Sequence, residues 1–448
     1  MNIIIIGDIM IDLNYNSEIT RNAPEADIPI YNILSNNYII GGAGNVAINL
    51  KHLGTNVEII SVIGSDANGR LIKQHLDSNR ITNKLYVDTN RDTTQKNRIF
   101  LNNKLNVRFD IEQTNDIPID IENDIIAYVL LKQHVDAIII SDYDKGVLTE
   151  RLCKSIIKHA NENRIPTFVD PKIKNYMKYN GCFLIKPNQH EAEVISRGES
   201  AIDKILVSIK EQINCDNILI TRGKNGMIFN NVHNNIEHDS DIDLVDVTGA
   251  GDIVLSTLVY CYLKYGDLLK ACRISNYVGG KSVKVIGNYN VSLNDIDEYK
   301  IIYDYETEKI ASLSKYHNIV FTNGCFDILH SAHIKNLKFA KSNGDILVVG
   351  LNSDESVKRL KGHERPINNI IERSTILSLF DFIDYIIIFS EDTPYSVLKL
   401  LKPNVIVKGS DYQIENIVGS EFATKIVLFN YIDGKSSTNV INKIKESY

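Results

Sequence analysis

Short apolar runs, rich in isoleucine and valine, alternate with longer stretches of helical periodicity along most of the chain. In the first two thirds these runs cover residues 3–6, 57–62, 137–140, 167–169, 183–185 and 217–220. Short apolar runs separated by helical patterns are typical of parallel strands that helices cover on both faces. The rhythm restarts with further runs at residues 319–321, 346–349 and 405–407. The pattern therefore predicts an α/β protein.

The length of 448 residues exceeds that of one ordinary domain, so the restart of the rhythm indicates a second domain. We expect a first domain at residues 1–300, a charged linking helix at 301–315 and a second domain at 316–448. Residues 83–112 alternate polar and apolar positions, which predicts antiparallel strands. These strands are expected to form a small β lid on the first domain.

Composition narrows the classes of function. A net charge of −7 argues against general nucleic-acid binding, which needs a basic face. No segment approaches the ~20 apolar residues of a membrane span, so no membrane partner is expected. The six cysteines are scattered and include no Cys-x-x-Cys pair. Such usage is typical of reduced thiols, and with the lack of a basic leader it predicts a cytoplasmic protein.

Polar and glycine-rich segments follow four successive predicted strands, at residues 141–146, 170–172, 186–191 and 221–226. The carboxyl ends of parallel strands are where such folds bind ligands. Asn188 and Glu191 lie three positions apart at a predicted helix start and share a face, as water-mediated Mg²⁺ ligands do. The alternative is a helix that begins with an asparagine cap and an acidic first turn.

A run of small residues precedes a predicted helix at 253–263 and reads Asp246-Val247-Thr248-Gly249-Ala250-Gly251-Asp252. The first N–H groups of a helix lack internal partners and carry the positive end of its dipole. Small residues at 249–251 let a phosphoryl group approach these donors. Asp252 then suits a general base that takes the proton of an attacking sugar hydroxyl. The alternative is that Asp252 caps the helix.

Further candidates for sugar contacts lie toward the N-terminus. Asp12 and Asn14 follow the first predicted strand and can accept hydrogen bonds from sugar hydroxyls, and a solvated loop is the alternative. Gly41 and Gly42 permit close approach of a ligand, and Asn45 offers both a donor and an acceptor. The basic residues that can contact a phosphate on the substrate are Lys96, Arg98, Arg108 and Lys172. Exposed strand faces are the alternative explanation for the three that fall in the predicted lid.

Taken together, these motifs resemble, in order and spacing, those of the ribokinase-like sugar kinases. The resemblance covers residues 1 to about 300 and implies an α/β/α fold with a β lid. It implies that Asp252 is the catalytic base and that Gly249, Ala250 and Gly251 form the anion hole. The residues it implies at Mg·ATP are Asn188, Gln189, His190, Glu191, Thr221, Gly223, Gly226 and Asn276, with Glu191 at the metal. Those it implies at the sugar are Asp12, Gly42 and Asn45.

In the second half, a predicted strand at 319–321 leads to a helix that carries His330 and His333 at its start. Side chains three positions apart face one way, so the two can bind a metal or stabilise charge on nucleotide phosphates. No third metal ligand has a recognisable spacing, which favours the phosphate role. Two exposed histidines at a helix start are the alternative.

This half, residues 316–448, resembles the nucleotidyltransferases of the cytidylyltransferase-like superfamily, which have a Rossmann-like α/β fold. The signature of that family is His-x-x-His, and Ala332 stands where the family usually has glycine. The resemblance implies nucleotidyl transfer in which His330, His333 and Lys408 stabilise charge. The further residues it implies at the nucleotide are Thr322, Asn323, Gly324, Phe326, Asp354, Ser437 and Thr438.

Joined in this order, the two halves resemble a bifunctional family that makes ADP-activated heptose for bacterial lipopolysaccharide. The resemblance implies a kinase for O1 of heptose 7-phosphate and an adenylyltransferase for heptose 1-phosphate, both using ATP, with Mg²⁺. It also implies a homodimer through the kinase domain and small-molecule substrates only. The alternatives are another sugar phosphate, CTP in place of ATP, or a non-catalytic nucleotide-binding scaffold.

Overall fold

The computed structural model describes residues 1–232, 235–236, 247–285, 287, 289–304, 307–315, 317–410 and 412–430. The chain forms two compact units, Met1–Leu293 and Asn294–Tyr448, and each has its own sheet. None of the helices within these described ranges is long and apolar enough to cross a lipid bilayer.

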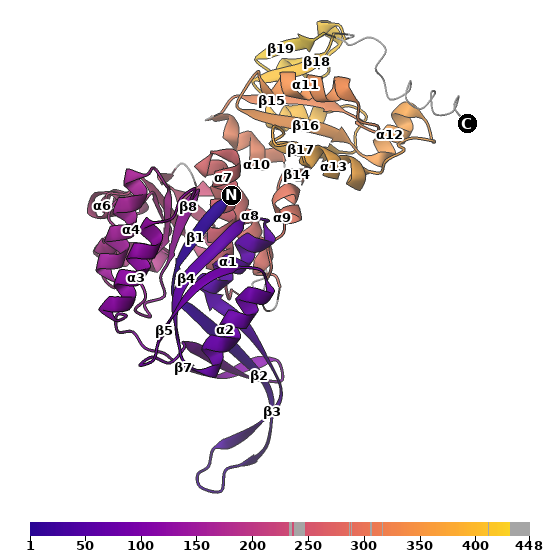
Figure 1. The fold of residues 1–448 in the computed structure, drawn as a ribbon. Helices are drawn as coiled ribbons and strands as arrows, with labels where there is room; N and C mark the ends of the chain where they lie inside the picture. The colour runs from indigo at the N-terminus through magenta and orange to yellow at the C-terminus, as the bar shows by residue number, and fades with distance from the viewer. Residues whose placement is uncertain are drawn as a thin grey trace. The chain divides into compact units, whose positions relative to one another are not determined.

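A nine-stranded sheet forms the centre of the first unit (Figure 1). Its strands lie in the order β13-β12-β11-β10-β9-β8-β1-β4-β5. Neighbours from β11 to β5 are parallel, whereas β12 and β13 are antiparallel additions at one edge. All six apolar runs predicted as strands in this half are confirmed. The strands are β1 (Asn2–Gly7), β4 (Asn56–Gly64), β5 (Thr82–Asp88), β8 (Ala137–Ser141), β9 (Thr167–Asp170), β10 (Leu184–Ile185), β11 (Asn217–Thr221), β12 (Met227–Phe229) and β13 (Asn235–Ile236).

Helices cover both faces of this sheet. On one face, Ile4 and Ile6 of β1 pack with apolar side chains of α3, α4 and α6. On the opposite side of the sheet, α1 packs against α7, and α7 packs against α8 (Figure 1). The helices are α1 (Ala43–His52), α2 (Ala67–Ser78), α3 (Ile119–Leu130), α4 (Glu150–Glu162), α5 (Gln189–Ile195), α6 (Ile202–Ile213), α7 (Ala250–Tyr265) and α8 (Leu268–Ser282).

The lid of the first unit is a four-stranded sheet in the order β3-β2-β6-β7. Its strands are β2 (Ile9–Asn22), β3 (Pro29–Gly42), β6 (Gln95–Leu101) and β7 (Lys104–Ile111). The prediction that residues 83–112 supply the lid is therefore only half right. β5 joins the main sheet, and the long hairpin of β2 and β3, which projects from the unit in Figure 1, supplies the other half of the lid.

The second unit has six parallel strands in the order β14-β17-β16-β15-β18-β19, which is a Rossmann-like arrangement. Neighbouring residues of β15 face opposite cores, because Phe321 packs with α14 and Val320 packs with α11 and α13. The strands are β14 (Ile301–Tyr303), β15 (Ile319–Gly324), β16 (Ile346–Asn352), β17 (Tyr385–Phe389), β18 (Val405–Gly409) and β19 (Lys425–Phe429). The helices are α9 (Leu293–Glu298), α10 (Thr307–Ala311), α11 (Ser331–Lys341), α12 (Asp354–Lys361), α13 (Ile370–Ser378) and α14 (Tyr395–Leu401).

The segment predicted as a linking helix, residues 301–315, differs from that expectation. Its first residues form β14, which pairs with β17 at the edge of the second sheet. The described remainder contains α10 and a turn of 3-10 helix at Ser312–Lys315. The triplet at 301–303 pairs its backbone with β17, and Ile301 and Ile302 pack against the two apolar cores of this unit, whereas Tyr303 is half exposed.

Candidate active sites

A cavity of about 1180 Å³ lies in the first unit, where the lid meets the carboxyl ends of the main-sheet strands. The predicted site residues that line it are Asp12, Gly41, Gly42, Asn45, Lys96, Arg98, Lys172, Asn188, Glu191, Thr221, Gly223, Gly249, Gly251 and Asp252. Those that do not line it are Arg108, Gln189, His190, Gly226, Ala250 and Asn276. Arg108 instead forms an exposed ion pair with Asp110 of its own strand, at 2.6 Å.

Asp252 lies in the first turn of α7, and the helix cap is Gly249. The alternative that Asp252 caps the helix is therefore wrong. Gly249 has a φ of +73°, and a Cβ at this position would lie 2.8 Å from the Nδ2 atom of Asn45. Only glycine adopts this left-handed φ readily and also has no Cβ that would displace Asn45. Its bare backbone leaves the positive end of α7 open to the cavity.

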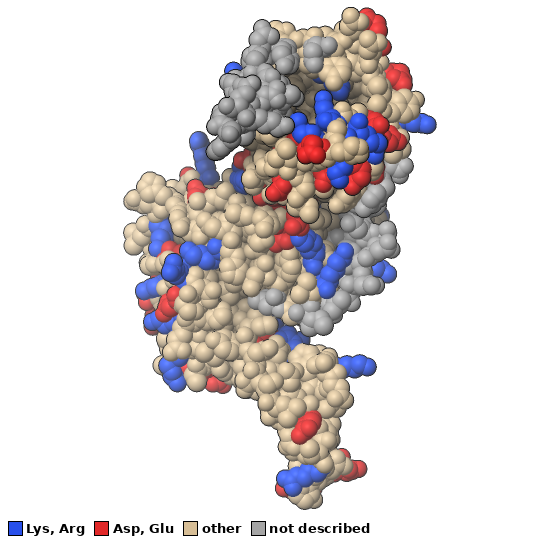
Figure 2. All heavy atoms as spheres, turned by 90° about the vertical axis from the view of Figure 1, so that its right-hand side faces the viewer, with Lys and Arg blue, Asp and Glu red and all other residues tan. Residues whose placement is uncertain are grey.

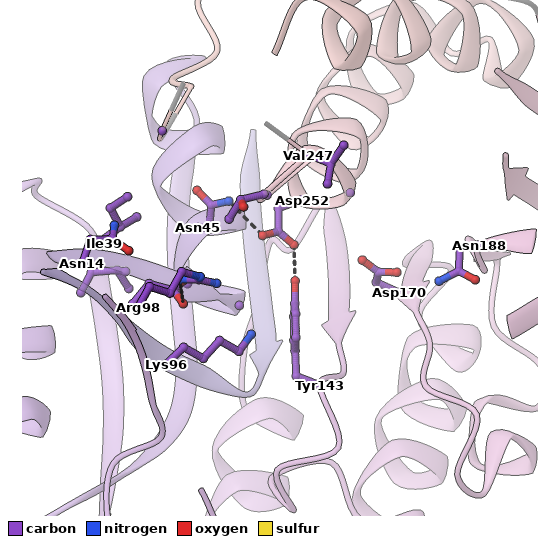
Figure 3. Close-up of a pocket in the computed structure, with 18 of the residues that line it drawn as sticks. Asn14, Ile39, Asn45, Lys96, Arg98, Tyr143, Asp170, Asn188, Val247 and Asp252 are labelled. Carbon is purple, nitrogen blue, oxygen red and sulfur yellow. Dashed lines mark hydrogen bonds and ion pairs between the residues drawn. The ribbon is translucent and has the colours of Figure 1, made fainter. Parts of the chain in front are cut away.

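The Asp252 carboxylate is buried and held on both oxygens (Figure 3). Asn45 donates from Nδ2 to Oδ2 at 2.9 Å, and the Tyr143 hydroxyl donates to Oδ1. Burial raises the pKa of Asp252 to about 6, against the opposing effect of these two hydrogen bonds. A carboxylate with a raised pKa inside a cavity is suited to accept a proton near neutral pH.

Basic and acidic side chains lie on the sheet side of the cavity near this helix. The buried Lys186 forms an ion pair with Asp170 at 3.0 Å, and a Cβ at Gly251 would lie 3.7 Å from the Lys186 amine. Lys186 therefore adds a positive charge next to the start of α7. Burial raises the pKa of Asp170, and the charge of Glu191 acts in the same direction.

Asn188 and Glu191 form a capping box at the start of α5. The Asn188 side chain accepts the Glu191 N–H at 2.9 Å, and Glu191 Oε2 accepts the Asn188 N–H at 2.9 Å. The capping alternative is thus present in the structure. Glu191 Oε1 also accepts a hydrogen bond from the Lys172 amine at 2.8 Å. Both residues still line the cavity, so the cap places them beside any bound ligand.

The lid brings polar groups to the opposite side of the cavity. Asp12 of β2 and Arg98 of β6 form a 2.8 Å ion pair across neighbouring strands. Lys96 lies next to them, and its burial is the main cause of the lowered pKa of its amine. Asn14 also lines the cavity, and its buried Oδ1 has no hydrogen-bond partner in the described part of the chain.

In the second unit, the histidines lie at the start of α11, beyond the carboxyl end of β15. His330 is the cap of α11, and the rings of His330 and His333 stack with centroids 3.7 Å apart. The Phe326 ring contacts His333 at 5.3 Å. Burial, with the charge of His330, lowers the pKa of His333 to about 4. His333 is therefore mostly a neutral imidazole at neutral pH.

Other predicted residues of this unit gather at the same edge of its sheet. Lys408, near the end of β18, donates to the side-chain oxygen of Asn323 near the end of β15. Thr322 and Gly324 flank Asn323 on β15. Asp354, at the start of α12, accepts a hydrogen bond from the buried Arg373 at 2.6 Å. The predicted residues Ser437 and Thr438 lie outside the described residues.

Sequence reasoning missed several residues that these sites contain. Tyr143, Asp170 and Lys186 line the cavity. All three fall in or next to polar segments after strands, so their positions carried a signal. Arg373 reaches the second site from α13, and its position inside a helical pattern carried none.

Comparisons with known proteins agree with this architecture. The pfkB family of carbohydrate kinases matches residues 1–295, and the cytidylyltransferase-like family matches residues 321–440. Phosphofructokinase-2 from Escherichia coli covers 66% of this chain and 97% of its own, with 18% identity and a TM-score of 0.56. Ribokinase from Arabidopsis thaliana has the same coverage, with 12% identity and a TM-score of 0.52. These structures confirm the ribokinase-like fold of the first unit.

Curated relatives match from end to end. The bifunctional protein HldE of Aliarcobacter butzleri is 39% identical over 100% of this chain and 98% of its own length. Those of Campylobacter jejuni strain RM1221 and of a Nitratiruptor species are 38% and 37% identical, over 99% of this chain and 97% and 99% of their own lengths. The chain therefore belongs to the family of bifunctional HldE proteins, in which a sugar kinase is fused to a cytidylyltransferase-like nucleotidyltransferase.

Proposed function

We propose that the first unit phosphorylates O1 of D-glycero-β-D-manno-heptose 7-phosphate with ATP, and that Asp252 is the base. The observation that carries this proposal is the buried Asp252 carboxylate, held on both oxygens at the open start of α7 inside the cavity. The O1 proton passes to Asp252 as O1 attacks the γ-phosphorus and ADP leaves. The bare backbone at 249–251 and the Lys186 amine stabilise charge on the moving phosphoryl group.

The lid binds the other end of the sugar phosphate in this proposal. Lys96 and Arg98 face the cavity and are the candidates for the 7-phosphate. Arg98 is already paired with Asp12, whose carboxylate is left to accept sugar hydroxyls. Arg108 lies outside the cavity and is not part of this site.

Mg²⁺ fits the nucleotide side of the cavity. Mg²⁺ in kinases is usually held by one or two carboxylates, waters and the substrate phosphates rather than by a full protein cage. Glu191 and Asp170 line the cavity and would hold it, and burial together with the charge of Glu191 raises the pKa of Asp170. No group of three or more His, Cys, Asp or Glu side chains in the described ranges forms a cage of its own. Bound there, Mg²⁺ would neutralise charge on the β- and γ-phosphates.

The second unit adenylylates heptose 1-phosphate in this proposal. The sugar phosphate attacks the α-phosphorus of ATP, and pyrophosphate leaves without a covalent enzyme intermediate. His330, His333 and Lys408 stabilise the charge that develops on the phosphates. A separate phosphatase must remove the 7-phosphate between the two reactions.

Substitutions in the full-length chain test the two assignments against each other. D252N is expected to lose heptose 7-phosphate phosphorylation by several orders of magnitude and to keep adenylyl transfer. H330A with H333A is expected to show the reverse. Mass spectrometry of the products, with ATP and with CTP, also identifies the nucleotide. Near wild-type phosphorylation by D252N would reject the base, and CDP-sugar formation would reject adenylyl transfer.

We also propose a homodimer through the kinase unit. The lid exposes apolar side chains along its strands, and residues other than Lys, Arg, Asp and Glu make up most of its visible face in Figure 2. Leu34 is 65% exposed and Phe109 is 47% exposed. Exposed apolar groups of this kind are typical of interaction surfaces. L34E is expected to give a monomer in sedimentation velocity, and an unchanged dimer would reject this surface.

The reactions are proposed to take place in the cytoplasm. All six cysteines are free, and five of them are buried. Reduced thiols of this kind persist where the thiol pool is reducing. Fractionation of cells that express the chain, followed by detection of both activities, tests this location.

A further inference from the structure

The segment after β8, residues 142–147, is fixed to the main sheet before it reaches the cavity. The buried Asp8 carboxylate accepts the backbone N–H groups of Tyr143, Lys145 and Val147, at 2.8, 3.1 and 3.1 Å. Asp142 is fixed separately, because it accepts the Tyr179 hydroxyl at 2.6 Å. The backbone of Tyr143 is therefore held by its neighbours on both sides, which is unusual for a connecting loop.

The ring of Tyr143 is held from the lid and from the main sheet. Lys96 of β6 and Lys172 after β9 place their amines 5.4 and 5.6 Å from the ring centroid. Cations at this distance are attracted to an aromatic face. Figure 3 shows the ring upright below Asp252, with the Lys96 amine directed toward it. Rotation of the ring would lose these contacts.

The hydroxyl of Tyr143 ends at the reacting group. It donates to Asp252 Oδ1, while Asn45 donates to Oδ2. With one donor on each oxygen, the carboxylate cannot rotate without breaking a hydrogen bond, yet each oxygen keeps a lone pair for a substrate hydroxyl. The other charged groups that act on this pair are Asp170 and Lys186 on Asp252, and Asp12 and Asp170 on Tyr143.

We propose that Tyr143 is a positioning residue of the kinase reaction, which orients the Asp252 carboxylate toward the sugar hydroxyl and favours its ionised form. This inference rests on the proposed role of Asp252 as the base. The Tyr143 proton stays on its own oxygen, because burial and the charge of Asp252 raise the pKa of the phenol well above its usual range. The sugar proton alone passes to Asp252.

The test compares Y143F with Y128F in the full-length enzyme. Tyr128 does not line the cavity. It is a matched control because its hydroxyl also donates to a carboxylate, that of Glu58, at 2.5 Å. Lys84 and Lys132 also lie over the Tyr128 ring, at 5.3 and 4.2 Å. Each variant thus loses a phenol hydroxyl that donates a hydrogen bond to a carboxylate, from a ring that has two lysine amines near its face.

For each variant, kcat and KM of the kinase are measured from pH 5 to 9, with thermal unfolding of the full-length chain as the check on folding. A hydrogen bond to an ionised group lowers its pKa, so its loss raises the pKa of Asp252 further. Y143F is expected to move the acid limb of kcat/KM upward by about one pH unit and to lower kcat about tenfold, with the KM for ATP unchanged. Y128F is expected to keep the wild-type profile.

Two results would overturn the inference. One is a Y143F enzyme with the wild-type acid limb and kcat, and the other is a fall in kcat without a shift of the limb, which packing alone would cause. D252N separates this failure from that of the proposed function. If D252N is inactive while the Y143F profile is unchanged, only the role of Tyr143 fails. If D252N is active, the base assignment fails and the role of Tyr143 fails with it.

Discussion

Replacement of Gly249 by alanine tests whether the geometry at the start of α7 controls the kinase. The added Cβ would lie 2.8 Å from Asn45 Nδ2, which is closer than real Cβ contacts. Asn45 has little room to yield, because Asn49 donates to its Oδ1 at 3.1 Å while Asn45 itself donates to Asp252. G249A is therefore expected to break the Asn45–Asp252 hydrogen bond.

The magnitude follows from two separate terms. Gly249 has a left-handed φ of +73°, and an alanine there costs about 1–2 kcal/mol of stability. Loss of a hydrogen bond to a charged group costs about 1.5–3 kcal/mol, which lowers kcat by roughly 10- to 150-fold if the bond is needed in the transition state. The backbone strain alone acts on stability, whereas the lost hydrogen bond acts on catalysis.

Gly266 provides the matched control, because it ends the same helix with a φ of +70° and a Cβ there would meet nothing within 4 Å. G266A is expected to lose similar stability in thermal unfolding and to keep wild-type kcat. Steady-state phosphorylation of heptose 7-phosphate by both variants is the assay. Wild-type kcat in G249A, or equal losses of kcat in the two variants, would refute the reasoning.

Three further predictions concern stability, pH and the second unit. R373M is expected to lower the free energy of unfolding of the second unit by about 3–5 kcal/mol in chemical denaturation, because it leaves the carboxylate of Asp354 without its buried partner. R359A removes only a half-exposed ion pair and should cost less than about 1 kcal/mol. Because the pKa of Asp252 is raised from 3.8 to about 6, the folded chain binds more protons than the unfolded chain between these pH values. The stability that Asp252 contributes is therefore present below this window and is lost as pH rises through it. D252N should therefore be more stable than wild type at pH 8, by up to about 3 kcal/mol, with the difference gone by pH 4. A332G removes one methyl group from the first turn of α11 and should change the KM for ATP in adenylyl transfer by less than tenfold, so a larger fall in KM would indicate that Ala332 crowds the nucleotide.

The strands of both sheets could be predicted where apolar runs are continuous, because burial on both faces leaves a clear pattern. The hairpin of β2 and β3 could not, because its outer part is rich in asparagine and exposed, so no apolar periodicity marks it. β14 could not be predicted from the sequence for a different reason. Its three residues follow a charged helix, and only the partner strand β17 makes them a strand.

The site could be predicted in part for similar reasons. Asp252 and Asn188 lie in short motifs whose spacing reflects helix starts, and such local geometry can be read from sequence. The contact between Tyr143 and Asp252 joins residues 109 positions apart, so only the folded chain brings them together. Arg373 likewise depends on tertiary packing, because its partners lie on three other segments.

The continuity of β3 with α1 links sugar capture to alignment of the base. β3 runs from the lid to Gly42, Gly42 caps α1, and Asn45 is the third residue of that helix. No flexible connection separates the strand that covers the sugar from the side chain that holds Asp252. A substitution that tilts the hairpin would therefore shift Asn45 within one helical turn. The hydrogen bond that holds Asp252 thus depends on the same strand that covers the sugar, although Asn45 and Asp252 lie 207 positions apart in the chain.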